Sequence, residues 1–176
     1  IMKKNVEIIS LIYKSKDYLH LIYNQLKSDY CKANEWDVGI RILLNDATDE
    51  IKEEVKKLDI NHTIFENPDK NEYYLNRVYK AWNHCAVSSE YDNVCFVNSD
   101  MLFSPNWLSN LLKHHNGIHI PTSRLIESGK LNTAPGRHGI VRNFGKTCNN
   151  INYPAFLDFA RQVSENKVIP SGLFMP

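Results

Sequence analysis

The sequence predicts an α/β domain with a mainly parallel central sheet flanked by helices. Patterns typical of strands and of helices alternate between residues 6 and 112, and such alternation is typical of parallel strands joined by right-handed helical crossovers. The apolar run VCFV at residues 94–97 has no polar alternation, which predicts a strand buried on both faces. A chain of 176 residues is long enough to bury a substantial core in one domain.

Each strand and helix of this half has its own local signal. The first helix is expected to begin near Asp17, after which apolar residues recur at the spacing of one buried helical face. Thr48 can cap the second helix. Ser104 and Pro105 are favoured as N-cap and first helical residue, and they predict the start of the fourth helix. The expected strands are residues 6–12, 38–44, 63–65 and 94–97, and the third helix has its apolar face between residues 75 and 85.

The chain after residue 117 has weaker patterns. Residues 118–121 are expected to form a short strand, and residues 122–150 are polar with little periodicity. A long segment of this kind is often a functional loop. Residues 155–163 are expected to be helical, and residues 168–175 have the pattern of a last strand.

The composition is that of an ordinary globular protein. Hydrophobic residues make up 43% and charged residues 23% of the chain, close to globular averages. The net charge of +1 argues against a nucleic-acid partner. No apolar run approaches the ~20 residues of a membrane span and no signal-peptide pattern opens the chain, so we expect a cytoplasmic protein without a transmembrane segment. The four cysteines lack CxxC spacing, so a zinc site is unsupported. Without a signal peptide, reduced thiols are favoured over disulfides.

Polar side chains follow each expected strand. The carboxyl ends of parallel strands meet at one edge of a sheet, where open α/β sheets bind their ligands. Four sequence-distant segments are therefore expected to converge on one rim. They are Tyr13 and Lys14, Asn45 and Asp46, Glu66 and Asn67, and Asn98, Ser99 and Asp100.

The chemistry of this rim favours a divalent cation that binds phosphates. The chain contains neither G-x-G-x-x-G after the first strand nor a P-loop motif. Mg²⁺ and Mn²⁺ are commonly held by one or two carboxylates plus substrate phosphates, and Asp100 fits that role, with Asn98 or Ser99 hydrogen-bonded to ribose or phosphate. The alternative is that Asn98–Ser99–Asp100 and Asn45–Asp46 are ordinary turns, because these residue types favour turns and caps.

Four pieces of the chain resemble GT-A fold glycosyltransferases, in particular the inverting enzymes of family 2. They are VEIISLIYKSKDYL, ILLNDATDE, Ala81-Trp82-Asn83 and VCFVNSDMLFSPNWL, in the order and with the spacing of that family. The resemblance covers roughly residues 5–115. It implies a single GT-A-like domain over residues 1–176, in which residues 1–116 bind a nucleotide-sugar. Residues 117–176 would form an acceptor-side loop and the incomplete start of the catalytic half.

The resemblance also assigns roles to residues. Asn98 and Asp100 occupy the ends of the family's Asp-x-Asp motif, which makes Asp100 the expected ligand of Mn²⁺ or Mg²⁺. Asn98 replaces the first Asp, so one carboxylate remains. Trp82 lies in a helical pattern and is expected in the core. The expected nucleotide-binding residues are Tyr13, Asn45, Asp46, Asn83, Asn98 and Ser99.

The implied activity is transfer of a sugar from a nucleotide-diphosphate sugar, with a UDP-sugar as the expected donor, to a hydroxyl of a glycan or another acceptor. Such an enzyme is a hexosyl- or N-acetylhexosaminyl-transferase that inverts the anomeric carbon. The catalytic base is unknown and is expected beyond Pro176, in a part of the protein that follows this chain. Two alternatives stay open, namely a nucleotide-binding module without catalysis and a sugar-phosphate nucleotidyltransferase.

Overall fold

The computed structural model describes residues 4–118, 120–128, 139–165 and 168. The chain forms two compact units, Ile1–Phe103 and Ser104–Pro176. This division comes earlier in the chain than the one expected after residue 116.

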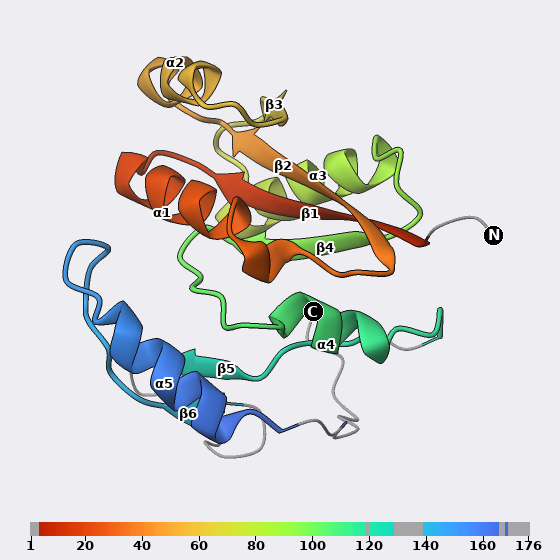
Figure 1. Ribbon diagram of the computed structural model, residues 1–176. Coiled ribbons are helices and arrows are strands. Elements are labelled where there is room, and N and C mark those ends of the chain that lie inside the picture. The colour runs from red at the N-terminus through yellow and green to blue at the C-terminus, as the bar shows by residue number, and fades with distance from the viewer. Residues whose placement is uncertain (1–3, 119, 129–138, 166–167, 169–176) are drawn as a thin grey trace. The chain divides into compact units, whose positions relative to one another are not determined.

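The first unit is built on a four-stranded parallel sheet (Figure 1). Its strands are β1 (Lys4–Ile12), β2 (Trp36–Asn45), β3 (His62–Phe65) and β4 (Val94–Asn98). The spatial order is β3-β2-β1-β4. The prediction of an α/β fold with a mainly parallel central sheet is therefore confirmed.

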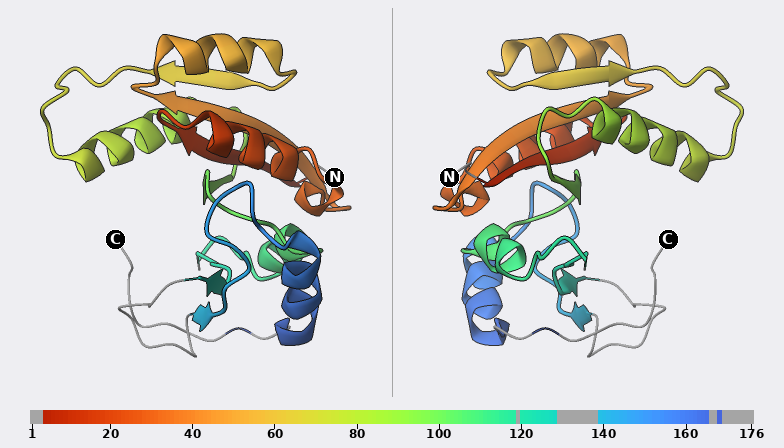
Figure 2. Two further views of the ribbon diagram at one scale, coloured as in Figure 1. Left: turned by 90° about the vertical axis from the view of Figure 1, so that its left-hand side faces the viewer. Right: turned by 90° about the vertical axis from the view of Figure 1, so that its right-hand side faces the viewer.

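Helices cover both faces of this sheet. In Figure 1, α1 (Lys16–Leu26) lies in front of the sheet and α3 (Tyr74–Val87) behind it. Right-handed crossovers explain the arrangement, because the chain steps outward from β1 to β2 and then returns behind β2 and β1 to reach β4. The helix α2 (Asp49–Lys57) follows β2, and a 3₁₀ turn (Asp29–Cys31) follows α1. Figure 2 shows the same elements from both sides.

The core is centred on β1, which has neighbours on both sides. Ile8 and Ile9 point to opposite faces of the sheet, and neither is exposed to solvent. Ile9 and Leu43 pack with Ala81 and Cys85 of α3 in one buried cluster. A strand with buried residues on both faces is typical of a central parallel strand.

The prediction that residues 94–97 are buried on both faces is wrong for most of the strand. β4 is the last strand in the order of this sheet, so fewer neighbours cover it. Val97 is buried, but Val94 and Cys95 are only half-buried and Phe96 is 37% exposed. Edge position cannot be read from an apolar run alone, because strand order is a property of the whole topology.

A buried ion pair ties β1 to β2. Both carboxylate oxygens of Glu7 accept hydrogen bonds from Arg41, from Nε and Nη2 at 2.8 Å each. The hydroxyl of Ser89 donates a further bond to Glu7 at 2.7 Å. Because the charges are paired and hydrogen-bonded, their burial is tolerated, whereas removal of one partner would leave an uncompensated buried charge.

The second unit contains α4 (Trp107–Lys113), two short parallel strands and α5 (Tyr153–Val163). The strands β5 (Leu125–Glu127) and β6 (Gly139–Val141) lie in the region expected to be a loop. The helix expected at residues 155–163 is confirmed. No strand forms in the described part of residues 118–121, and residues 169–175 of the expected last strand lie outside the described residues.

The predicted start of the fourth helix is wrong. α4 begins at Trp107, and its N-cap position is Asn106 rather than Ser104. Trp107 N donates to Ser104 O at 3.3 Å, and Asn106 has a left-handed backbone with φ of 62°. Pro105 followed by a residue with positive φ is the pattern of a type II turn, so these residues form a turn before the helix.

Candidate functional site at the carboxyl edge of the sheet

A cavity of about 270 Å³ lies at the carboxyl ends of β1, β2 and β4. The order β3-β2-β1-β4 reverses direction between β1 and β4, and crevices of this kind at such switch points are where open α/β sheets bind ligands. Segments far apart in sequence supply its walls. The lining residues are Leu11, Tyr13, Tyr18, Asn45, Tyr74, Arg77, Val78, Trp82, Asn98, Ser99 and Asp100.

The cavity brings together five of the residues singled out from the sequence, namely Tyr13, Asn45, Asn98, Ser99 and Asp100. Five others are not part of its wall, namely Lys14, Asp46, Glu66, Asn67 and Asn83. Asn83 lies on an exposed part of α3 and Asp46 lies behind the wall, where other side chains enclose it.

The turn after β4 supplies oxygen atoms on one side of the cavity. Asn98 and Asp100 are exposed and Ser99 is half-buried. An amide, a hydroxyl and a single carboxylate make a donor set suited to a hard cation that takes its remaining ligands from phosphates or water. Within the described ranges, no three His, Cys, Asp or Glu side chains form a group that could hold a metal by itself.

Asp46 is a buried anion enclosed by donors. Its backbone is left-handed, with φ of 49°, and its side chain is 6% exposed. Oδ1 accepts from the Asn67 backbone N at 2.8 Å and from Lys70 Nζ. Oδ2 accepts from Asn67 Nδ2 at 2.8 Å and from Arg77 Nη1 at 3.1 Å. Both oxygens are thereby occupied.

These contacts set the charge state of Asp46. Burial alone would raise the pKa of Asp46, but the hydrogen bonds from Lys70 and Asn67 outweigh it and lower the pKa. The same pairing with Asp46, together with Glu66, raises the pKa of Lys70. The carboxylate is therefore ionised at neutral pH, and it anchors the loop after β3 to the end of β2.

Asn45 and Asn67 complete this anchor. Asn67 Nδ2 donates to Asn45 Oδ1 at 2.7 Å, and both residues are almost fully buried. The sequence placed Asn67 on the rim, but it did not single out Lys70 or Arg77. A signal was available in retrospect, since a carboxylate buried at the end of β2 needs cationic partners, and the segment after the next strand carries two.

Aromatic side chains form much of the remaining wall. Tyr13, Tyr18, Tyr74 and Trp82 line the cavity. Trp82 also stacks on Phe96, with ring centroids 5.2 Å apart and planes at 25°. Trp82 also packs against the buried cluster of Ile9, Leu43, Ala81 and Cys85, so it contacts the core as expected and lines the cavity in addition.

Positive charge gathers around Tyr13. Lys14 Nζ lies 4.6 Å from the centroid of the Tyr13 ring. A hydrogen bond from Lys14 is the main cause of a lowered pKa of the Tyr13 hydroxyl, with Arg77 adding to it. Two cations therefore lie at this side of the cavity, opposite in sign to the carboxylate of Asp100.

No family model, curated protein or solved structure matches this chain. The function is therefore inferred from the cavity and its residues. In the described part of the chain, no helix combines the length and the apolar character needed to cross a bilayer. None of the four cysteines, all of which the structure describes, forms a disulfide.

Proposed function

We propose that this chain is the donor-binding part of a glycosyltransferase that takes a sugar from a nucleotide-diphosphate sugar, with a UDP-sugar as the first candidate. The observation that carries the proposal is the single cavity lined by Tyr13, Asn45 and the turn Asn98–Ser99–Asp100. These residues come from three strand ends, and each was singled out from the sequence for a nucleotide-sugar site. The acceptor would be a hydroxyl of a glycan or of another molecule.

The cavity wall suits a nucleoside. Tyr13, Tyr74 and Trp82 line the cavity, and aromatic side chains can stack on any base because every base has a π-face. Asn45 and Arg77 supply amide and guanidinium groups at the same wall, and these can hydrogen-bond the edge of a base or the ribose. Asp46 keeps Arg77 in place through the contact at 3.1 Å.

The oxygen-rich side of the cavity suits the diphosphate with a divalent cation. Asp100 would hold Mn²⁺ or Mg²⁺, while Asn98 and Ser99 can bind phosphate or ribose through their amide and hydroxyl groups. A bound cation would stabilise the negative charge that develops on the diphosphate as the glycosidic bond breaks. The role of Asp100 is thus to place positive charge next to the leaving group.

A thermal-shift experiment tests this proposal with UDP, GDP and CTP, each with and without Mn²⁺. We expect a nucleoside diphosphate to stabilise the protein only when Mn²⁺ is present. At about 100 times the dissociation constant the stabilisation is about 2.7 kcal/mol, which corresponds to about 5–10 °C for a chain of this size. Asp100→Asn should abolish the Mn²⁺-dependent part of the shift.

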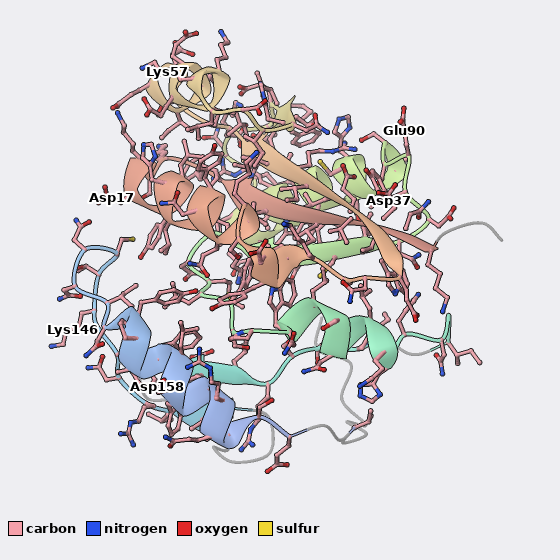
Figure 3. All side chains as sticks on the ribbon, in the orientation of Figure 1. Asp17, Asp37, Lys57, Glu90, Lys146 and Asp158 are labelled. Atoms are coloured by element: carbon pink, nitrogen blue, oxygen red, sulfur yellow. The ribbon has the colours of Figure 1, made fainter. Side chains whose placement is uncertain are left out.

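The matched control is Asp37→Asn, which removes an exposed carboxylate at the opposite end of the sheet, where Figure 3 labels Asp37. This variant should behave like the wild type. Absence of a shift with all three nucleotides would overturn the proposal. A shift confined to CTP would favour nucleotidyl transfer instead.

A further inference from the structure

A second cavity of about 250 Å³ adjoins the first. The two cavities share Tyr13, Tyr18 and Ser99 as lining residues. Its other walls are Ile12, Lys14 and Ser15, all from the end of β1 and the turn before α1. A ligand that leaves the first cavity past Ser99 therefore enters the second.

The sizes of the cavities fit one ligand that extends through both. Small-molecule sites usually have volumes of about 300–1,000 Å³, and each cavity alone, at about 270 and 250 Å³, is smaller than that. The first cavity has room for a nucleoside, but a nucleotide-diphosphate sugar is much longer. Its phosphates and sugar have to extend beyond the aromatic wall, and Tyr13, Tyr18 and Ser99 are the residues common to both cavities.

The second cavity has the polar groups of an anion site. Lys14 is exposed and brings three N–H donors. Ser15 Oγ accepts a hydrogen bond from Tyr18 N at 3.2 Å, and a hydroxyl that accepts still has its own proton to donate. Ser99 adds another hydroxyl, and among the described residues that line this cavity none carries a carboxylate. Asp100, by contrast, lines only the first cavity.

We infer that Lys14 binds the phosphate groups of the ligand, which pass over Ser99 from the first cavity into the second. The inference rests on the proposed function and extends it by a ligand-binding residue. Asp100 would hold the cation that neutralises the diphosphate, and the ammonium of Lys14 would bind the phosphate oxygens directly. Lys14 already lies at the ring of Tyr13, so its charge is in position before the ligand arrives.

The test is isothermal titration calorimetry with uridine, UMP and UDP in the presence of Mn²⁺, or with the guanosine series if GDP is the better ligand. Lys14→Ala should weaken UDP binding at least about tenfold, as expected for loss of a charge-assisted hydrogen bond. Uridine has no phosphate, so its affinity for the Lys14→Ala variant should lie within about twofold of its affinity for the wild type. Lys14→Arg keeps the charge and should restore most of the UDP affinity.

Lys16→Ala is the matched control. Lys16 is an exposed neighbour that pairs with Glu54 at 3.2 Å and lines neither cavity. Lys16→Ala should therefore leave the affinities for uridine and UDP unchanged. Equal weakening of uridine and UDP by Lys14→Ala would overturn the inference, because Lys14 would then act through the nucleoside part. Unchanged UDP binding by the Lys14→Ala variant would also overturn the inference. The proposed function would still stand in that case if Asp100→Asn abolished UDP binding. If the wild type binds none of these nucleotides, the inference about Lys14 and the proposed function both fail.

Discussion

The carboxylate of Asp46 is a buried charge whose two oxygens accept four hydrogen bonds, two of them from Lys70 and Arg77. Such a carboxylate has little capacity left for a ligand. Asp46 therefore acts as a positioning residue, because it holds Arg77 against the cavity and fixes the loop that contains Asn67. Of the two cations that pair with Asp46, Arg77 lines the cavity.

The lowered pKa of Asp46 makes its contribution to stability depend on pH. Since the folded-state pKa lies below the ordinary value of 3.8, the contribution is fully present above about pH 4 and is lost as the pH falls through the folded-state pKa. We expect Asp46→Asn to lower the free energy of unfolding by about 1–3 kcal/mol at pH 6. The difference from the wild type should shrink at pH 3.

Urea unfolding at both pH values measures this difference. Asp37→Asn, which removes an exposed carboxylate, serves as the control and should leave the free energy of unfolding unchanged at either pH. A difference between Asp46→Asn and the wild type that is equal at pH 6 and pH 3 would contradict the assigned ion cluster.

Among the elements, the turn before α4 is the clearest case in which local backbone geometry determines where a helix begins. Asn106 adopts φ of 62° and ψ of 12°, a conformation that costs roughly 1–2 kcal/mol for an ordinary L-residue and little for glycine. Asn tolerates it better than most residues, which explains why Asn stands between Pro105 and Trp107.

This geometry predicts opposite effects of two substitutions at one position. Asn106→Ala should destabilise the protein by about 1 kcal/mol, because alanine disfavours positive φ. Asn106→Gly should be neutral or slightly stabilising. Chemical unfolding of both variants tests this geometry. If Asn106→Ala were more stable than Asn106→Gly, which is the ranking of a helix interior, the left-handed turn would be contradicted.

Local signals explain which elements the sequence predicted well. Thr48 caps α2 and accepts from Ile51 N as expected, and α5 covers the residues assigned to it. The edge position of β4 and the presence of β5 and β6 depend on strand order and on pairing between distant segments. Local patterns do not contain that information.

The same distinction applies to the site. Polar residues that directly follow a strand were predicted, and five of them line the cavity. The partners of Asp46 come from positions up to 31 residues further along the chain, and their contacts arise only when β3 and α3 are in place. Asn83 was chosen by resemblance alone, and it lies outside the cavity wall.

For the molecule as a whole, the topology explains why the site is where it is. Strands are added outward from β1 to β3, and the chain then returns to place β4 on the other side of β1. The helices that follow β1 and precede β4 therefore leave the sheet on opposite faces, and the crevice between the two strand ends stays open. Tyr13 and Lys14 line this crevice from the β1 side, and Asn98–Ser99–Asp100 line it from the β4 side.

NMR can locate a bound nucleotide on the protein directly. Backbone amide NMR shifts of the protein would be recorded during titration with UDP and Mg²⁺. We predict that the perturbed amides cluster at Tyr13, Asn45 and the turn Asn98–Ser99–Asp100, and that Asp37 at the opposite end of the sheet is unaffected. Perturbations that are absent, or that map away from the carboxyl ends of β1 and β4, would contradict the assignment of this cavity as a nucleotide site.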